Sequence, residues 1–304
     1  MISVVIPAYN ETGNISVIAG KIKEQLQWEG SYEILFVDDG STDGTLQEIK
    51  AAINEDPCVK YISLSRNFGH QNALKAGMDY ATGDCVICMD ADMQHPPHVL
   101  AKLITYWKEG YDVVYTVRKD NGSVSVFKRA TSKGFYKLMN LLCDVDVPMG
   151  SADFRLVDKK VVNEIRQFRE NWIFIRGLVS WLGFRQIGVE YAAEPRHSGD
   201  SKYSLSKMIA FAVQGITSFS ILPLRLSMVV GFIFSMVSFL YGVYALYVKI
   251  FTGVALKGWT SILMSILFLG GIQLLSLGII GEYVGKTFIE TKGRPSYVIR
   301  EKRV

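Results

Sequence analysis

The sequence is poor in the residues that build disulfide frameworks and zinc sites. It has four cysteines and four histidines in 304 residues. Cys85 and Cys88 have no second cysteine pair or histidine cluster to complete a zinc site. They lie in a run typical of a strand, where residues three apart face opposite sides. We therefore expect all four cysteines to be reduced thiols in the core of a cytoplasmic domain.

Two common phosphate-binding signatures are also missing. The chain has neither the G-x-G-x-x-G fingerprint of dinucleotide-binding folds nor the lysine loop of P-loop proteins. It shows no internal repeat and no low-complexity tract. The first residues lack a basic start and include Pro7, so we expect no signal peptide. We also expect no nucleic-acid partner.

Charge is absent from two long apolar runs, Ser227 to Val248 and Trp259 to Gly281. Each run is long enough to cross about 30 Å of hydrocarbon as a helix. The segment between them holds two lysines, whereas the residues after Gly281 include six lysines and arginines. Because basic flanks stay on the cytoplasmic side, we expect a multi-pass protein with both termini in the cytoplasm.

Strand and helix patterns alternate over the first 120 or so residues. This alternation predicts an α/β fold with a mostly parallel sheet covered on both faces. The expected strands are 2–6, 33–37, 59–64, 85–89 and 112–116, with later candidates near 153–157 and 185–191. The expected helices are about 14–27, 43–54, 70–81 and 97–108.

Polar motifs follow four of the expected strands. The first ends before Tyr9-Asn10-Glu11, the second at Asp38-Asp39, the third before Arg66-Asn67, and the fourth before Asp90-Ala91-Asp92. Since the carboxyl ends of parallel strands meet at one edge, we expect these groups to line one rim.

The Asp90-Ala91-Asp92 triplet has two interpretations. Both carboxylates leave one face of an extended backbone. This arrangement suits Mg²⁺ or Mn²⁺, with substrate phosphates completing the coordination shell of the ion. Acidic residues after a strand also form solvated turns and helix caps, and an Asp-x-Asp alone favours that simpler interpretation. Asp38 and Asp39 are harder to explain by capping, because adjacent carboxylates repel unless they accept hydrogen bonds. A nucleotide base or ribose offers such donors.

Together these motifs resemble the family-two inverting glycosyltransferases of GT-A fold. Two C-terminal membrane helices and the segment Arg196-His197-x-Gly199-x-Ser201-Lys202-Tyr203 further resemble the polyisoprenyl-phosphate glycosyltransferases, which include bactoprenol glucosyltransferases and dolichyl-phosphate mannose synthase. The resemblance covers essentially the whole chain. The motifs that carry it are Pro7-x-Tyr9-Asn10-Glu11, Val37-Asp38-Asp39-Gly40-Ser41-x-Asp43-Gly44-Thr45, Arg66-Asn67-x-Gly69 and Asp90-x-Asp92-x-Gln94-x-Pro96-Pro97.

The resemblance implies a metal-dependent transferase with Mg²⁺ or Mn²⁺ as cofactor. It would move a sugar from a nucleotide sugar, UDP favoured over GDP, to a polyprenyl phosphate such as undecaprenyl phosphate. The lipid-linked sugar would serve cell-envelope glycan modification, and the sugar itself stays open. The implied metal ligands are Asp90, Asp92 and Gln94, and His95 is left as a loop residue. The implied nucleotide-sugar site comprises Pro7, Tyr9, Glu11, Asp38, Asp39, Asp90 and Ala91.

Basic side chains are candidates for the acceptor phosphate. The resemblance favours direct contact by Arg118, Arg129 and Arg196, with Ser132 one turn after Arg129 and Lys202 as a point charge. The lysines nearby have the simpler interpretation of a solvated basic face. These are Lys119, Lys128 and Lys133.

Asp153 and Asp92 are the expected catalytic residues. Asp153 matches the position of the family's catalytic acidic residue. A phosphate monoester has a second pKa near 6, so the nucleophile arrives largely ionised. We therefore expect Asp153 to position the acceptor or the sugar instead of removing a proton.

The chain divides into four expected segments. These are a cytoplasmic GT-A domain over 1–203, an interfacial amphipathic helix over 204–225, two transmembrane helices within 226–281, and a basic cytoplasmic tail over 282–304. A second membrane contact or a core helix is expected over 124–142. The resemblance implies a bacterial inner (plasma) membrane protein and a homo-oligomer such as a tetramer.

Two other functions agree less well with the sequence. A processive polysaccharide synthase would need a Gln-x-x-Arg-Trp motif, which is absent, and more membrane spans. A non-catalytic membrane-tethered scaffold that binds nucleotide sugars would tolerate a degraded metal motif, yet Asp90, Asp92 and Gln94 are all present. The transferase is therefore the favoured function.

Overall fold

This computed structural model describes residues 1–119, 148, 150–171, 173–192, 217, 220–252 and 258–304. The chain divides into two compact units. One comprises Met1–Gly215 with Arg294–Val304, and the other comprises Ile216–Gly293. Each unit is described by itself.

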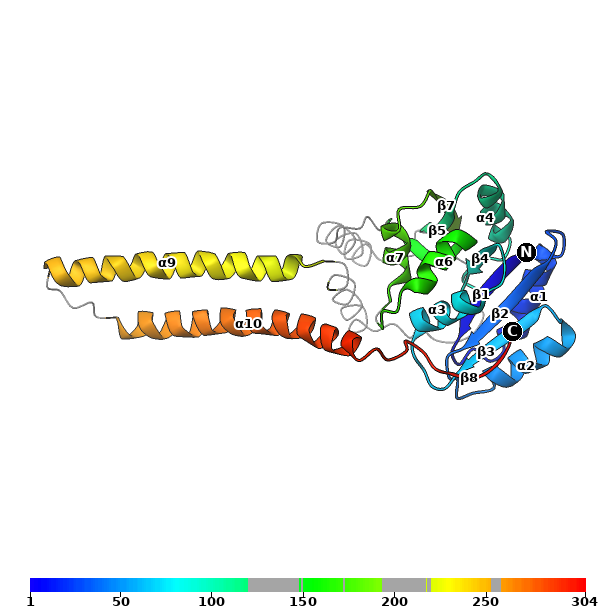
Figure 1. The fold of residues 1–304 in the computed structure, drawn as a ribbon, viewed down its shortest axis with the longest axis horizontal. Coiled ribbons are helices and arrows are strands. Elements are labelled where there is room, and N and C mark those ends of the chain that lie inside the picture. Colours follow the sequence, from blue (N-terminus) through cyan, green and yellow to red (C-terminus); the bar gives the residue numbers. More distant parts are fainter. Residues whose placement is uncertain (120–147, 149, 172, 193–216, 218–219, 253–257) are drawn as a thin grey trace. The chain divides into compact units, whose positions relative to one another are not determined.

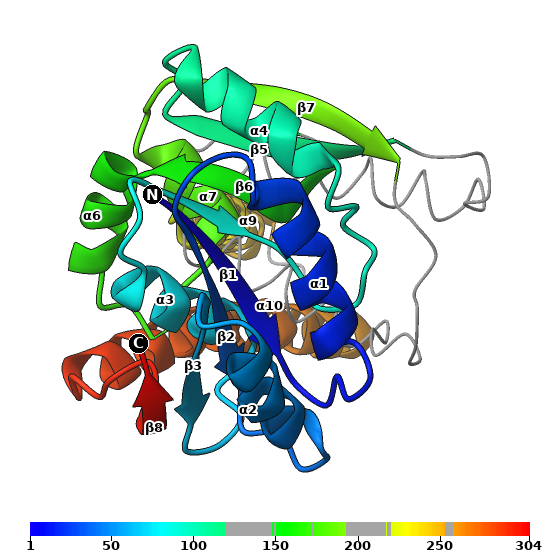
Figure 2. The same ribbon diagram turned by 90° about the vertical axis from the view of Figure 1, so that its right-hand side faces the viewer.

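A mixed eight-stranded sheet forms the centre of the first unit (Figures 1 and 2). Its spatial order is β7-β5-β6-β4-β1-β2-β3-β8. The four neighbours β4, β1, β2 and β3 run parallel, β6 is antiparallel to β4 and β5, and β8 is antiparallel to β3. The strands are β1 Ile2–Ala8, β2 Tyr32–Asp38, β3 Val59–Leu64, β4 Cys85–Cys88, β5 Val113–Lys119, β6 Ser151–Asp158, β7 Gln186–Ala192 and β8 Ile299–Arg303.

Helices cover both faces of this sheet because its strands alternate apolar side chains between two cores. Val4 and Ile6 belong to one core, with α1 (Ile15–Leu26), α2 (Thr45–Glu55) and α4 (Val99–Lys108). Val5 belongs to the other, with α3 (His70–Tyr80), α6 (Lys159–Gln167) and α7 (Ile175–Trp181). The predicted α/β fold with helices on both faces is confirmed.

The cysteines follow the predicted geometry with one exception. Cys85 and Cys88 are buried in opposite cores, as their spacing on β4 predicts. Cys58 is only half-buried, so its prediction as a core thiol is wrong. It lies in the turn between α2 and β3, where the chain passes the surface. Cys143 lies outside the described residues.

The C-terminal end differs most from expectation. Residues 282–304, which the sequence analysis assigns to a basic tail, contain the end of α10 and all of β8. The Ile299–Arg303 strand is highly charged and only partly buried, so it lacks the apolar alternation that identifies a strand. Pairing with the edge of β3 is what makes it a strand.

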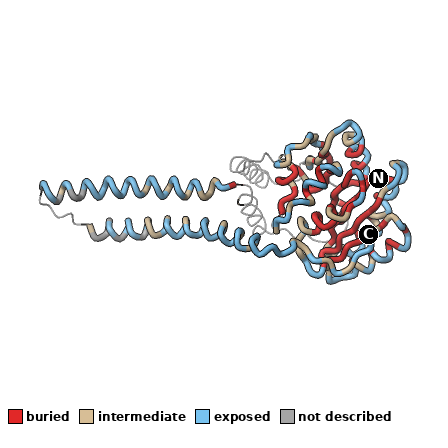
Figure 3. The backbone as a smooth tube through the Cα atoms, viewed as in Figure 1, coloured by how far each residue is buried: buried red, intermediate tan, exposed pale blue. Residues whose placement is uncertain are grey.

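The second unit is a hairpin of α9 (Leu222–Thr252) and α10 (Trp259–Thr291). Leu222–Tyr244 and Met264–Thr291 are long and apolar enough to cross a membrane. Figure 3 shows both helices exposed along their length, and the exposed side chains include Phe232, Leu240 and Leu274. Such a surface suits hydrocarbon better than water.

Close packing of α3 on the sheet can be tested at Gly77. A Cβ there would lie 2.1 Å from Val5 Cγ1 and 3.1 Å from Val37 Cγ2. Gly77→Ala should therefore destabilise the protein by about 1–3 kcal/mol through overpacking. The measurement is the thermal unfolding midpoint of the purified full-length chain in detergent.

Gly20→Ala is the matched control. Gly20 lies in α1, and a Cβ there would meet nothing within 4 Å. This variant should gain up to about 1 kcal/mol from helix propensity. Equal midpoints for the two variants would contradict the close approach of α3 to β1.

Candidate active site

The loops that follow β1, β2 and β3 are joined to one another at the carboxyl edge of the sheet. The Asn10 amide donates to Ser41 Oγ at 3.0 Å, which joins the first loop to the second. Asp39 accepts from the amides of Phe68 at 2.7 Å and Gly69 at 2.9 Å, which joins the second to the third. The predicted convergence of these strand ends is therefore confirmed.

Backbone conformation at this edge is unusual at several residues, among them Gly40, Asn10 and Met93. Gly40 has φ of 68°, and a Cβ there would lie 2.4 Å from the carbonyl carbon of Arg66, so only glycine fits. Asn10 and Met93 have φ of 53° and 63°, which non-glycine residues rarely adopt. Such conformations persist where the surroundings hold them, and they cluster at functional sites.

Asp38 and Asp39 find their hydrogen-bond donors within the protein. Asp38 is fully buried, and it accepts from the Ser41 amide at 3.0 Å and from Ser63 Oγ at 2.8 Å. The expectation that a nucleotide must supply donors for this pair is therefore wrong. Sequence reasoning missed these donors because three of them are backbone amides and the fourth lies on another strand.

The Asp39 carboxyl group has a pKa raised to about 6. Burial is the main cause, and the charge of Asp38 adds to it. The two backbone hydrogen bonds from Phe68 and Gly69 act in the opposite direction. Each carboxylate oxygen can still accept a further hydrogen bond.

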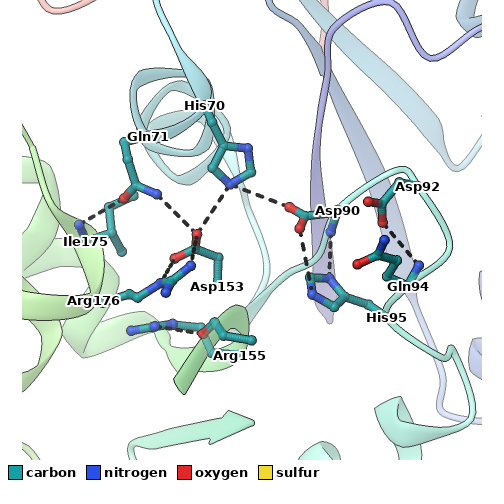
Figure 4. A network of polar contacts seen from close by, with 11 residues as sticks. His70, Gln71, Asp90, Asp92, Gln94, His95, Asp153, Arg155, Ile175 and Arg176 are labelled. Atoms are coloured by element: carbon teal, nitrogen blue, oxygen red, sulfur yellow. Dashed lines mark hydrogen bonds and ion pairs between the residues drawn. The ribbon is translucent and has the colours of Figure 1, made fainter. Parts of the chain in front are cut away.

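The turn after β4 presents Asp90 toward the centre of the site (Figure 4). The Asp90 amide donates to His95 Nδ1 at 2.9 Å, and the His95 ring stacks on Phe154 at 4.9 Å. The Gln94 amide donates to Asp92 Oδ1 at 3.1 Å. His95 is buried and holds the shape of this turn, so the loop-residue prediction understated its role.

Asp153 on β6 lies opposite Asp90 and is held by a guanidinium group (Figure 4). Arg176 contacts both its oxygens, Nε at 2.7 Å from Oδ1 and Nη2 at 2.8 Å from Oδ2. Gln71 Nε2 donates to Asp153 Oδ2 at 3.2 Å. His70 Nε2 lies 3.5 Å from both Asp153 Oδ2 and Asp90 Oδ1, so it bridges the two carboxylates.

Opposing charges set the protonation of this cluster. Burial raises the pKa of Asp153, but the charge and hydrogen bonds of Arg176, with His70, hold it well below its usual range. Loss of surrounding water lowers the pKa of His70, but Asp90 and Asp153 raise it to about 9. Asp153 is thus an ionised carboxylate already engaged by donors.

Sequence reasoning assigned no role to three residues of this cluster, although His70 belongs to the polar run that follows the third expected strand. His70 and Gln71 begin α3 directly after the Arg66–Gly69 motif, and Arg176 lies near the start of α7. The position of His70 at a βα turn was a usable signal. Arg176 had no such signal in the sequence. Its partner Asp153 is 23 residues away, and neither helix α7 nor the contact between Arg176 and Asp153 was predicted.

The remaining predicted nucleotide-sugar and acceptor residues differ in how far they are exposed to solvent. Pro7 and Ala91 are buried, while Tyr9 and Glu11 are partly exposed on the first loop, where Glu11 accepts from Asn14 Nδ2 at 2.7 Å. Arg118 is exposed near the end of β5. Four expected acceptor residues lie outside the described residues, namely Arg129, Ser132, Arg196 and Lys202, as do 124–142 and most of the 204–225 segment.

The turn after β4 has a donor set that fits a divalent cation. Asp90 Oδ1 is shielded from solvent and accepts no hydrogen bond from the described residues, with His70 Nε2 at ion-pair distance, 3.5 Å away. Asp92 and the Gln94 amide carry further oxygen atoms of the hard kind on the same turn. The described residues contain no group of three His, Cys, Asp or Glu side chains that could hold a metal. A cation here would therefore need oxygens from a substrate to complete its shell.

Comparison with known proteins agrees with this architecture. The family model described as "Glycosyl transferase family 2" matches residues 3–166, and "GtrB C-terminal hairpin" matches 222–287. The chain is 44% identical over 300 residues to "Uncharacterized glycosyltransferase YkcC" of Bacillus subtilis, covering 98% of this chain and 93% of the relative. It is 40% identical over 303 residues to "Bactoprenol glucosyl transferase" of Shigella phage SfX, covering 99% of each.

Among solved structures, the mannosyltransferase PcManGT from Pyrobaculum calidifontis, in complex with GDP-Man and Mn²⁺, aligns with a TM-score of 0.47 and 18% identity. The alignment covers 71% of this chain and 63% of that one, a similarity too low to transfer residue roles. The family models and the full-length relatives are decisive. They confirm the resemblance to polyisoprenyl-phosphate glycosyltransferases, and the chain belongs to glycosyl transferase family 2 as a glycosyltransferase of GT-A-type fold with a GtrB C-terminal hairpin.

Proposed function

We propose that this glycosyltransferase moves a sugar from a nucleotide sugar, with UDP as the nucleotide, to undecaprenyl phosphate with inversion. The observation that carries the proposal is the set of opposed groups at one edge of the sheet. Asp90 lies on one side and the Arg176-held Asp153 on the other, with His70 between them. The acceptor class rests on full-length relatives named as bactoprenol glucosyl transferases.

The donor nucleotide is assigned to the first two loops. Tyr9 and Glu11 follow β1, and Asp39 follows β2 at the neighbouring strand end. Asp39 is ionised at neutral pH and can accept an imide N–H from a base. The sugar would then lie toward Asp90 and Asp153, and the diphosphate between Asp90 and Asp92.

A divalent cation would be held by Asp90, Asp92 and Gln94 together with the donor diphosphate. When bound, it would neutralise the charge that develops on the leaving diphosphate. The protein groups themselves orient the donor: the 2.9 Å bond from the Asp90 amide to His95 fixes the turn that carries both carboxylates.

Asp153 is assigned a positioning role. Its pKa lies well below the usual range, and Arg176 and Gln71 already occupy its oxygens. A carboxylate with so low a pKa is a poor proton acceptor at neutral pH. The phosphate nucleophile is already largely ionised and needs no strong base. Asp153 therefore orders Arg176 and His70 around the reacting groups.

Chain connectivity supports a membrane topology. Because Met1–Gly215 and Arg294–Val304 belong to one compact unit, we assign the start of the first candidate span and the end of the second to the same side of a bilayer. We assign that side to the cytoplasm of a bacterial inner membrane, where nucleotide sugars are available. A homo-oligomer, a tetramer for example, remains part of the proposal.

The first prediction from this function concerns the product. Full-length protein in detergent with undecaprenyl phosphate, Mg²⁺ or Mn²⁺ and a panel of UDP- and GDP-sugars should form a lipid-linked monosaccharide, detected by mass. Chelation should stop the reaction and added cation should restore it. Asp90→Asn should lower kcat about a hundredfold or more, whereas Asp84→Asn, an exposed carboxylate at the amino end of β4, should not.

Two results would reject this function. Products with several sugars on one lipid would indicate a processive synthase. Donor binding without any lipid product would indicate a tethered scaffold.

The second prediction concerns pH and Asp39. Because its pKa is about 6, Asp39 is ionised above that pH and protonated below it. Affinity for UDP-glucose, whose diphosphate does not titrate in this range, should fall by about tenfold per pH unit below pH 6. Calorimetry between pH 8 and pH 5 measures it. Asp39→Asn should bind UDP-glucose more weakly at pH 8, and its affinity should no longer fall below pH 6. If the affinity of the variant still falls with pH as in the wild type, another group is responsible for the titration.

The third prediction separates positioning from proton removal at Asp153. Asp153→Asn keeps one acceptor oxygen, which can still accept from Arg176 Nη2 and Gln71 Nε2, so kcat should fall less than about tenfold. Asp153→Ala and Arg176→Gln remove charge-assisted hydrogen bonds and should each lose about a hundredfold. Steady-state kinetics with the lipid acceptor measures both. Equal and severe losses in Asp153→Asn and Asp153→Ala would identify Asp153 as the base.

A further inference from the structure

Strand β8 brings an arginine from the C-terminal end of the chain to the edge of the donor loops. In its pairing with β3, Glu301 is opposite Ser63 and Ile299 is opposite Leu64, so Arg300 is an extra residue in the ladder. An irregularity of this kind redirects a side chain that regular alternation would send to the other face.

The neighbours of Arg300 are fixed on both faces of the sheet. Glu301 lies 2.7 Å from Lys50 of α2, and Lys302 lies over the Tyr80 ring of α3 at 4.1 Å. Just before the strand, Tyr297 donates to Asp79 Oδ2 at 2.8 Å. These contacts hold β8 in one register, so the direction of Arg300 is determined by the fold.

Arg300 contacts a buried pair of polar side chains. Its Nη2 donates to Ser63 Oγ at 3.1 Å and lies 4.0 Å from Asp38 Oδ2. Ser63 Oγ in turn donates to Asp38 Oδ2 at 2.8 Å. Ser63 and Asp38 are fully buried, whereas Arg300 is about half exposed. Arg300 thus places a positive charge beside a buried carboxylate, where isolated charge is costly.

The contacts continue from Asp38 to the loops assigned to the donor. Asp38 Oδ1 accepts from the Ser41 amide at 3.0 Å, and Ser41 Oγ accepts from the Asn10 amide at 3.0 Å. Asn10 Oδ1 accepts from the Thr42 amide at 2.9 Å and has the positive φ noted above. The conformation of both loops therefore depends on how the Asp38 carboxylate is held.

We propose that Arg300 is a positioning residue for the donor nucleotide and that β8 completes the donor side of the site. It acts through Ser63 and Asp38 and does not itself touch the reacting groups. The proposal rests on the proposed function in that the donor is taken to be a nucleotide sugar. It assigns Asp38 a role in shaping the pocket instead of contacting the nucleotide.

The test compares Arg300→Gln with Arg303→Gln in the full-length chain. Both variants remove one positive charge from β8, but Arg303 pairs with Tyr61 and has no contact with Ser63 among those described. Arg300→Gln should raise KM for the nucleotide sugar about five- to tenfold, the loss of one charge-assisted hydrogen bond. Its kcat should stay within about twofold. Arg303→Gln should match the wild type, and Arg300→Lys should recover part of the lost affinity.

Two results would overturn the proposal: the same donor KM in Arg300→Gln and Arg303→Gln, or a fall in kcat with KM unchanged. If Arg300→Gln unfolds too readily to assay, Ser63→Ala removes the hydroxyl that links the two charges. Ser63→Ala should raise the donor KM as well. Adding Arg300→Lys to Ser63→Ala should raise the donor KM no further. Additive effects of the two substitutions would contradict the inference that Arg300 acts through Ser63.

Nucleotide binding separates this inference from the proposed function. Calorimetry with UDP and with GDP needs no lipid acceptor and no turnover. Weaker binding in Arg300→Gln than in Arg303→Gln supports the inference even if no lipid product forms. Equal binding, together with normal product formation, rejects the inference and leaves the function standing.

Discussion

Parallel pairing of β4, β1, β2 and β3 is the constraint on which the rest of the site depends. The register is continuous from Ala8 to Asp38 and from Asp38 to Ser63, so three strand ends come to one level. This alignment lets short loops exchange hydrogen bonds, such as those that Asp39 accepts from Phe68 and Gly69. A shift of one residue would turn Asp38 toward the opposite core and separate the loops.

Charge balance shapes the catalytic side. Asp90 and Asp153 lie on either side of His70, and Asp92 follows on the turn that carries Asp90, so their negative charges need to be balanced. Arg176 neutralises Asp153, and His70 lies between Asp153 and Asp90. In the proposed function, Asp90 and Asp92 would hold a cation together with a diphosphate, which bring their own charges. The same principle explains Arg300 beside Asp38, where a buried carboxylate at the donor side is balanced by a cation from the end of the chain.

Most regular elements were predictable because their patterns are local. The predicted strand 59–64 coincides with β3, and the other early strands and helices agree within two or three residues. Asp90, Asp92 and Asp39 could be singled out as candidates because they come soon after buried strands, and their roles stay predictions. His70 and Arg176 were not recognised, since their importance comes from a shared contact with Asp153. Strand β8 was not predicted, because pairing with β3 and not apolar alternation makes it a strand.

The sequence by itself determined the α/β alternation, the two apolar runs and the family, because each of them depends on consecutive residues or short motifs. The tertiary structure alone decided which carboxylates are already satisfied. It showed that Asp38 accepts from Ser63 and lies beside Arg300, and that Asp153 is held by Arg176. The reason is physical: the protonation and availability of a carboxylate depend on donors within about 4 Å, and those donors come from distant parts of the chain.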